Sequence, residues 1–183
     1  MRKKSILKSI LYLLIGSALS ISCSSDDGNQ NNPPPAANEN TWTLDTNNFI
    51  RSNSTQTATT YTSGEPFTIV NVDSNFNNNQ IFKTCNFIPT FNTHTTGTYT
   101  VKSQNTVFSN VTLKTMYIKC FVSNGLGNGA MYESMDSDLT ATVTQVDGKS
   151  VVTITEPVTL TRTYNDNFPQ APQTFTLTCN KVR

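Results

Sequence analysis

Few residues of this chain have the types and spacing that catalysis requires. His94 is the only histidine, and it lies in a polar stretch that predicts a turn, so any serine or cysteine nucleophile would depend on it as base. No serine occupies a Gly-x-Ser-x-Gly turn. Paired carboxylates could hydrolyse a glycoside, and the only dense acidic group is Glu133, Asp136 and Asp138. We expect no enzymatic activity and no cofactor.

Metal-binding patterns are incomplete in this sequence. The segment that begins at Asp73 has the first ligand positions of a calcium loop, but Asn78 and Thr84 stand where glycine and glutamate are required. No two cysteines have zinc-site spacing. We expect solvated connections between strands and no metal site. The alternative is a calcium site whose carboxylates would be Glu133, Asp136 and Asp138.

The first 22 residues have the layout of a bacterial lipoprotein signal peptide. A basic start with Arg2 and Lys3 precedes a mostly apolar run over 10–21, and small residues lead to Cys23. The run is shorter than the roughly 20 residues that a membrane-spanning helix needs. We expect cleavage before Cys23 and lipidation of this cysteine, which anchors the chain to a membrane. An ordinary secretory signal and a retained anchor are the alternatives.

Residues 23–40 predict a disordered tether between the lipid and a domain. Beyond the cysteine they contain almost nothing that could be buried, and Pro33–Pro35 favours an extended backbone. The segment Ser24–Asp27 resembles the serine-plus-acidic stretch that follows the lipidated cysteine in surface-displayed lipoproteins of the Bacteroidota. This resemblance implies an outer-membrane protein on the cell surface, with the periplasmic face as the alternative.

Residues 41–183 predict a single domain that carries no net charge. Four of the thirteen basic residues and three of the twelve acidic residues precede residue 41, which leaves nine of each. The domain therefore lacks the basic footprint of a nucleic-acid-binding protein. We expect no nucleic-acid partner, and binding that rests on hydrogen bonds and apolar contact.

Strands are expected almost throughout this domain, because Thr, Val, Ile and aromatic residues dominate and helical periodicity is absent. About ten short strands predict an all-β fold, an antiparallel β-sandwich, with a closed or partly open β-barrel as the alternative. Besides one hairpin, the expected strands cover residues 41–45, 49–60, 67–72, 80–88, 97–103, 106–113, 115–122 and 174–181.

The hairpin around Asp147 and Gly148 has a register that the sequence predicts. This dipeptide supplies the positive φ angles of a two-residue turn. Apolar residues then oppose one another on one face, and threonines on the other. The expected pairs are Val146 with Lys149, Val143 with Val152 and Thr142 with Thr153. A bend is expected at Pro157, because proline cannot donate to the ladder.

Short motifs within the domain accompany the lipoprotein start. They are Trp42–Asp45, Gly97–Tyr99 and Val146–Lys149. Together they resemble small β-rich lipoproteins of unknown function from Bacteroidota, in the same order over most of the mature domain. The resemblance implies an all-β fold and an envelope location. It implies no activity, because that group has no assigned chemistry.

Cysteines of an exported domain lie where disulfides form and persist. The domain has three, Cys85, Cys120 and Cys179, so at most one pair can close. We expect one disulfide, with Cys85 to Cys120 as the preferred pair. The alternative is three buried thiols that act as small apolar side chains.

Four aromatic residues lie beside amides or carboxylates in segments too polar to be expected as strands: Phe76, Tyr132, Tyr164 and Phe168. Aromatic faces give apolar contact, amides fix orientation, and loops on a rigid sheet commonly carry recognition. We therefore expect a non-enzymatic binding module for a glycan or an envelope protein. The alternatives are rings that cap the sandwich ends, and a structural lipoprotein that braces an envelope complex through a sheet edge or apolar patch.

Overall fold

The computed structural model describes residues 39–61, 64–92 and 95–183. The expected signal peptide, Cys23, most of the expected tether and His94 lie outside these residues. Among the described residues, no helix has the length and apolar character that crossing a membrane requires.

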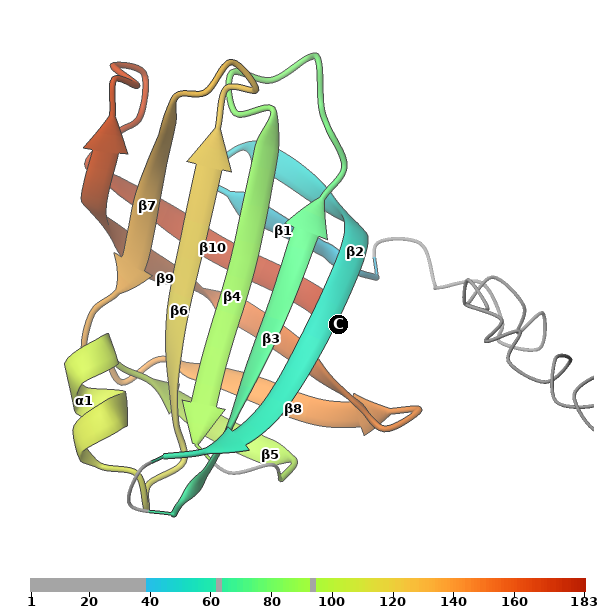
Figure 1. Cartoon of the computed structure of the whole chain (residues 1–183), viewed down its shortest axis with the longest axis vertical. Coiled ribbons are helices and arrows are strands. Elements are labelled where there is room, and N and C mark those ends of the chain that lie inside the picture. The colour runs from blue at the N-terminus through green and yellow to red at the C-terminus, as the bar shows by residue number, and fades with distance from the viewer. Residues whose placement is uncertain (1–38, 62–63, 93–94) are drawn as a thin grey trace, which may run out of the picture. The chain divides into compact units, whose positions relative to one another are not determined.

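The described part of the chain contains ten strands and one short helix (Figure 1). The strands are β1 (Thr41–Leu44), β2 (Asn47–Thr60), β3 (Pro66–Ser74), β4 (Thr84–Asn92), β5 (Gly97–Val101), β6 (Thr115–Ser123), β7 (Gly129–Ser134), β8 (Thr140–Val146), β9 (Lys149–Asp166) and β10 (Thr174–Val182). The helix is α1 (Gln104–Ser109).

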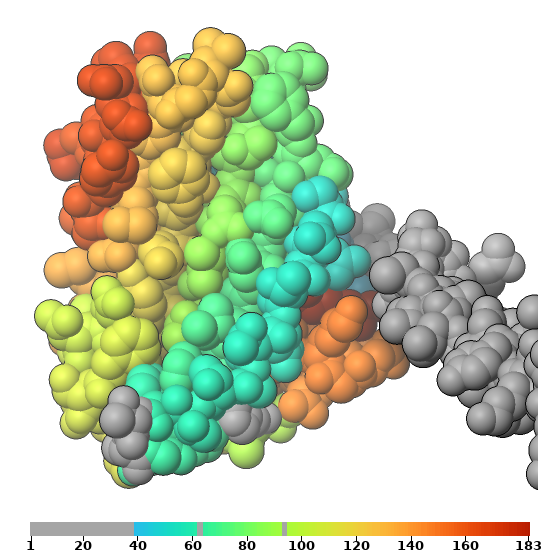
Figure 2. Space-filling model, in the orientation of Figure 1, coloured from blue at the N-terminus to red at the C-terminus, as the bar shows by residue number. Residues whose placement is uncertain are grey.

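The strands form one sheet that folds over into two packed layers. Strands β2, β3, β4, β6 and β7 make the layer nearer the viewer in Figures 1 and 2, and β1, β10, β9, β8 and β5 lie behind them. Strand β9 pairs with β10 along one edge and with β8 and β7 along the other. The expected all-β, sandwich-like fold is confirmed, with the two layers joined into a single hydrogen-bonded sheet.

Large apolar side chains fill the space between the two layers. The Trp42 ring lies 5.8 Å, centroid to centroid, from both Phe49 and Phe87. Burial of each such side chain stabilises the fold by roughly 2 kcal/mol. The largest fully buried side chains include Trp42, Tyr99, Tyr132, Phe49, Phe87, Phe91 and Phe168.

The predicted hairpin register is confirmed in the β8–β9 pair. Its residue pairs include Val146 with Lys149, Val143 with Val152 and Thr142 with Thr153. The two valines are buried, Thr142 is exposed and Thr153 is half-buried. The irregularity expected at Pro157 is also present, because residues 155–157 of β9 lie opposite the single residue Thr178 of β10.

The expected strand over residues 106–113 is wrong, because this segment contains helix α1. The Ser103 hydroxyl caps the helix by accepting a hydrogen bond from the Thr106 backbone N–H at 3.4 Å. Val107 is buried, and the Phe108 ring lies 6.5 Å from that of Tyr117 on β6. A cap and packing against the sheet thus outweigh the strand propensity of Val107 and Phe108.

Strand β7 was not expected from the sequence. Ala130, Tyr132 and Ser134 point into the core and alternate with Met131 and Glu133, which face outward. The Ser134 hydroxyl donates to the backbone carbonyl of Lys102 at 2.7 Å and accepts from the Ile118 N–H at 2.9 Å. Its burial is therefore compensated by hydrogen bonds, so a polar residue can occupy a core position in this strand.

Replacement of Gly148 with valine should lower the free energy of unfolding by about 1 kcal/mol or more. Gly148 has a φ of 74°, and an added Cβ would meet no atom within 4 Å, so the cost is conformational. Gly148→Asn is the control, because asparagine tolerates this region. Urea unfolding of both variants measures the effect, and equal stability of the two would contradict the expected turn.

Candidate functional site

An exposed aromatic row crosses three neighbouring strands on the outer face of the domain. Phe121 of β6 pairs with Met131 of β7, and Met131 pairs with Tyr164 of β9. The Phe121 and Tyr164 side chains are 41% and 53% exposed, and Met131 is half-buried. Figure 2 shows the outer face of β6 and β7 open to solvent. We call Phe121, Met131 and Tyr164 the aromatic row.

Strand geometry fixes the direction of the two rings. In β6 the residues Ile118, Cys120 and Val122 point into the core, so Phe121 between them points outward. A register shift between β7 and β9 pairs Met131 with Tyr164 and the buried Tyr132 with Arg162. This bulge adds a residue to β9 and leaves Tyr164 on the outer face.

A glycine leaves the space that the Phe121 ring occupies. A Cβ added at Gly129 of β7 would lie 2.4 Å from Cζ of Phe121, so only glycine permits this position of the ring. A second glycine acts in the same way at the end of the layer, where an added Cβ at Gly125 would lie 2.7 Å from Cε2 of Phe76. Both rings are therefore held against backbone.

Polar side chains border the aromatic row. On one side Lys119 of β6 pairs with Glu133 of β7, which offsets the two charges. The Tyr117 hydroxyl donates a hydrogen bond to Glu133, and burial together with this carboxylate raises the pKa of Tyr117. Beyond Phe121 the row meets Asn86 of β4, whose Nδ2 donates to Asp73 at 2.6 Å.

The connections next to the row are rich in amides. Asn124 Oδ1 accepts from the Leu126 backbone N–H at 2.8 Å, and Asn128 Nδ2 donates to the Asn167 carbonyl at 2.8 Å. The first bond lies within the β6–β7 turn, and the second holds this turn against the β9–β10 connection. Leu126 at the turn is 87% exposed and Phe76 in the β3–β4 connection is 57% exposed. This end of the domain therefore places the exposed apolar side chains of Leu126 and Phe76 near the amides of Asn124 and Asn128.

Two of the four rings expected as ligand contacts are buried. Tyr132 lies in β7, where its hydroxyl donates to the Pro172 carbonyl at 2.8 Å and its ring lies 4.6 Å from that of Phe175. Phe168 is 1% exposed and lies 5.2 Å from the Phe82 ring. Placing Tyr132 and Phe168 among ligand contacts is therefore wrong, and both rings belong to the core.

The other two rings are exposed, but only one lies in a connection. Phe76 follows β3, as expected, whereas Tyr164 lies within β9. Sequence reasoning missed Phe121 and Met131 as candidates. The signal for Phe121 was present in the alternation of β6, where every second residue from Met116 to Val122 is apolar. Met131 gave no such signal, because β7 itself was not expected.

The expected disulfide between Cys85 and Cys120 is wrong, since Cys85, Cys120 and Cys179 are all free and buried. Trp42 Nε1 donates to the Cys85 sulfur at 3.2 Å, and burial raises the pKa of Cys120 and of Cys179. The alternative of three buried thiols describes the structure. All three cysteines pack as small apolar side chains, and the raised pKa suppresses the nucleophilicity of Cys120 and Cys179.

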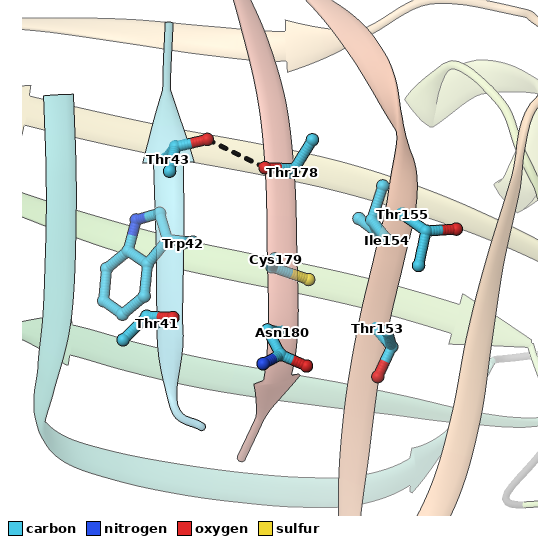
Figure 3. Close-up of a pocket in the computed structure, with 9 residues that line it drawn as sticks. All are labelled: Thr41, Trp42, Thr43, Thr153, Ile154, Thr155, Thr178, Cys179 and Asn180. Carbon is cyan, nitrogen blue, oxygen red and sulfur yellow. Dashed lines mark hydrogen bonds between the residues drawn. The ribbon is translucent and has the colours of Figure 1, made fainter. Parts of the chain in front are cut away.

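A hydroxyl-lined hollow of about 280 Å³ lies over β1, β9 and β10 (Figure 3). The Thr43 and Thr178 hydroxyls are 2.8 Å apart at its side. Trp42, which also lines it, is 1% exposed and so offers no aromatic face to a ligand. The hollow can form hydrogen bonds, but it lacks the apolar anchor that fixes a ligand in most sites.

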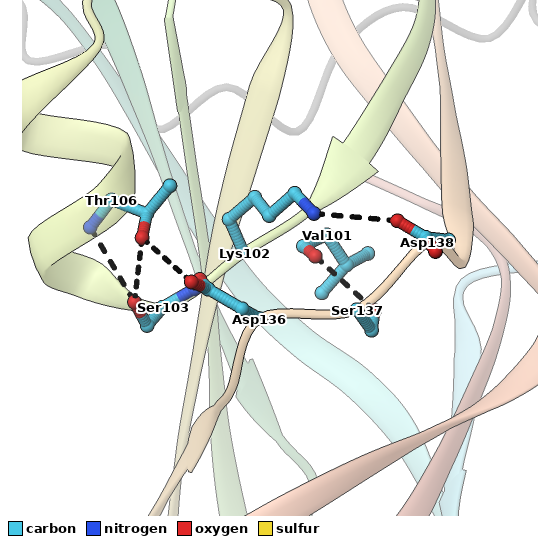
Figure 4. A network of polar contacts seen from close by, with 7 residues as sticks. All are labelled: Val101, Lys102, Ser103, Thr106, Asp136, Ser137 and Asp138. Atoms are coloured by element: carbon cyan, nitrogen blue, oxygen red, sulfur yellow. Dashed lines mark hydrogen bonds and ion pairs between the residues drawn. The ribbon is translucent and has the colours of Figure 1, made fainter.

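The three carboxylates considered as calcium ligands do not converge. Asp136 accepts from the Ser103 N–H at 2.8 Å and from the Thr106 hydroxyl at 2.9 Å, while Asp138 lies 3.6 Å from Lys102 Nζ (Figure 4). Glu133 accepts from Tyr117. Among the described residues, no group of three His, Cys, Asp or Glu side chains could hold a metal ion. The calcium alternative is wrong because each carboxylate has a separate structural partner.

No protein-family model, no curated protein and no solved structure matches the chain. The function of the domain must therefore follow from the chemistry and placement of its side chains.

Asp136→Asn should destabilise the domain near neutral pH and have little effect in acid. The hydrogen bonds from Ser103 and Thr106 lower the pKa of Asp136 in the folded state. A lowered folded-state pKa stabilises the fold above the unfolded-state pKa, and this stabilisation is lost as the pH falls through the folded value. Unfolding in urea should show a gap between variant and wild type at pH 7 that closes below about pH 4.

Asp138→Asn is the matched control, because its exposed ion pair should contribute little at any pH. A gap for Asp136→Asn that stays constant with pH would show that its carboxylate charge plays no part.

Proposed function

We propose that this protein is a lipid-anchored, non-enzymatic lipoprotein of the outer membrane, displayed on the cell surface, that binds a glycan through the aromatic row. The observation that carries the proposal is the pair of exposed rings, Phe121 and Tyr164, at fixed outward positions on neighbouring strands. Solvent-exposed rings joined by an apolar residue mark a contact surface. Anchoring at Cys23 follows from the sequence alone.

The chemistry of the row suits a sugar. An aromatic face carries a negative quadrupole, which favours contact with the polarised C–H groups on the face of a sugar ring. Neighbouring polar groups can then bind its hydroxyls, and Lys119, Glu133 and Asn86 border the row. Because the rings lie on strands, little side-chain or backbone freedom is lost on binding.

The position of the row supports access from outside the cell. The first described residue, Glu39, forms an ion pair with Lys181 at 2.6 Å, near the end of β10. There Val182 pairs with Val152 of β9, whereas Tyr164 lies twelve residues further along β9, at most about 40 Å away. In Figure 1 the C-terminus lies at the right and the end of β9 at the upper left. The chain thus enters the domain beside the end of β10, whereas the row lies toward the opposite end of β9.

A structural lipoprotein that braces an envelope complex receives less support. Pairing through a sheet edge needs free backbone groups. Residues 51–60 of β2 offer such an edge, because they pair with β3 on one side while β1 covers only residues 47–50 on the other. The side chains of this stretch are mostly Ser, Thr, Asn and Gln, so it adds little apolar area. The remaining apolar surface for such a role is the aromatic row together with Phe76 and Leu126. A protein partner at this surface is therefore the outcome that a negative glycan screen would favour.

Phe121→Ala and Tyr164→Ala should each weaken binding to a glycan identified on an array of immobilised glycans. A ring that anchors a ligand contributes on the order of 2 kcal/mol, or roughly thirtyfold in Kd. Both side chains are exposed, so the melting temperature should change little. Isothermal titration calorimetry measures the affinity. Leu113→Ala is the control, since Leu113 is 55% exposed and lies outside the row. Unchanged binding by both ring variants would exclude the row as the site.

Metabolic labelling with a fatty-acid probe should mark the wild-type protein and fail to mark Cys23→Ala, because the thiol of Cys23 is the proposed site of lipid attachment. Protease added to intact cells should remove the domain. Labelling of both proteins would refute lipidation at Cys23, and full protection from protease would place the domain on the periplasmic side.

A further inference from the structure

We infer that the ligand is an unbranched, uncharged polysaccharide that lies across the strands and contacts Phe121 and Tyr164 at the same time. This inference rests on the proposed function and adds the class and the orientation of the glycan. Phe121 and Tyr164 each pair with Met131, from opposite sides. Two strand spacings therefore separate their backbones, roughly 10 Å. One sugar ring cannot cover both aromatic rings, whereas a chain of sugars can.

The surface continues along the same line beyond Phe121. Asn86 of β4 pairs with Phe121, and Asp73 of β3 pairs with Asn86. This line of paired residues therefore crosses β9, β7, β6, β4 and β3. It runs from Tyr164 through Met131 and Phe121 to the polar side chains of Asn86 and Asp73. An extended ligand that crosses the strands meets apolar contact at one end and polar contact at the other.

Two further lines of paired residues flank the aromatic row, one on each side. On one side Ser123 pairs with Gly129, and Gly129 pairs with Asp166. The Phe121 ring lies over Gly129 on this flank. On the other side Lys119 pairs with Glu133 and Ile88. A ligand laid along the row is thus bordered on one flank by the longer side chains of Lys119 and Glu133, and on the other flank it contacts the Phe121 ring where this ring covers Gly129.

The charges around the row select against anionic polysaccharides. Asp73, Glu133 and Asp166 lie on or beside this line. Two basic residues also lie there: Lys119 pairs with Glu133, and the Lys83 backbone N–H donates to the Ser123 carbonyl at 2.7 Å. The acidic excess repels uronic or sulfated sugars, because like charges brought together disfavour association. It leaves hydroxyl-bearing neutral sugars as the class that fits.

Contact with two rings predicts a dependence on ligand length. Once a chain is long enough to reach both rings, the second contact forms at high effective concentration and the affinity rises steeply. Shorter oligomers contact one ring at a time. Removal of either ring should abolish the rise and leave the weaker binding of short oligomers.

The test measures affinity for linear neutral glucans, xylans and mannans and for their oligomers, from the monosaccharide upward, with alginate and polygalacturonate as anionic comparators. We expect one neutral series to show a rise of tenfold or more in affinity between two successive lengths. Phe121→Ala and Tyr164→Ala should remove the rise, and Tyr164→Phe should retain it because the ring is kept. Leu113→Ala should match the wild type, and melting temperatures check that all variants fold.

Three results would overturn this inference. The first is a smooth increase of affinity with length that either alanine variant lowers equally at every length, which would leave a single-ring glycan site and the proposed function intact. The second is stronger binding to the anionic comparators. The third is binding to none of these polymers. If a glycan array is also negative, the proposed function fails as well.

Discussion

Strand β9 is the element on which the rest of this fold depends, because it uses both of its hydrogen-bonding edges. One edge pairs with β10, while the other pairs first with β8 and then with β7. These contacts join the two layers into one sheet. Two irregularities make the arrangement possible. The bulge over residues 155–157 adjusts β9 to β10, and the shift beside Tyr132 turns Tyr164 outward.

Sequence reasoning succeeded where short-range patterns agreed with one another. The Asp147–Gly148 turn and the alternation on both faces of the hairpin required the same register, and a slip by one residue would have exposed Val143 and Val152. It failed where distant residues decide the structure. Helix α1 depends on Asp136, which lies 30 residues beyond Thr106 in the sequence, and β7 depends on partners in β6 and β9.

The candidate site was only half predictable, for the same reason. A ring beside amides can be a ligand contact or a core cap, and composition does not separate the two cases. The hydroxyl of Tyr132 reaches the Pro172 carbonyl, a contact 40 residues away that hides this ring. Tyr164 is exposed because of a bulge that no local sequence motif predicted. Phe121 could have been found, since its place in an alternating strand already implies an outward ring.

The separation between the chain entry and the aromatic row determines how the domain would bear mechanical load. If the protein is anchored and holds a large polymer, as we propose, it would be pulled at both ends, at Glu39 and at the far end of β9. The first strand, β1, begins beside the chain entry and pairs antiparallel with β10 and β2 on its two sides. Force along β1 shears these hydrogen bonds, so they must break together instead of one after another. Under such load the lifetime of the folded state would follow the unfolding rate, and the pairing of β1 on both sides would make this strand resist force between the chain entry and the row.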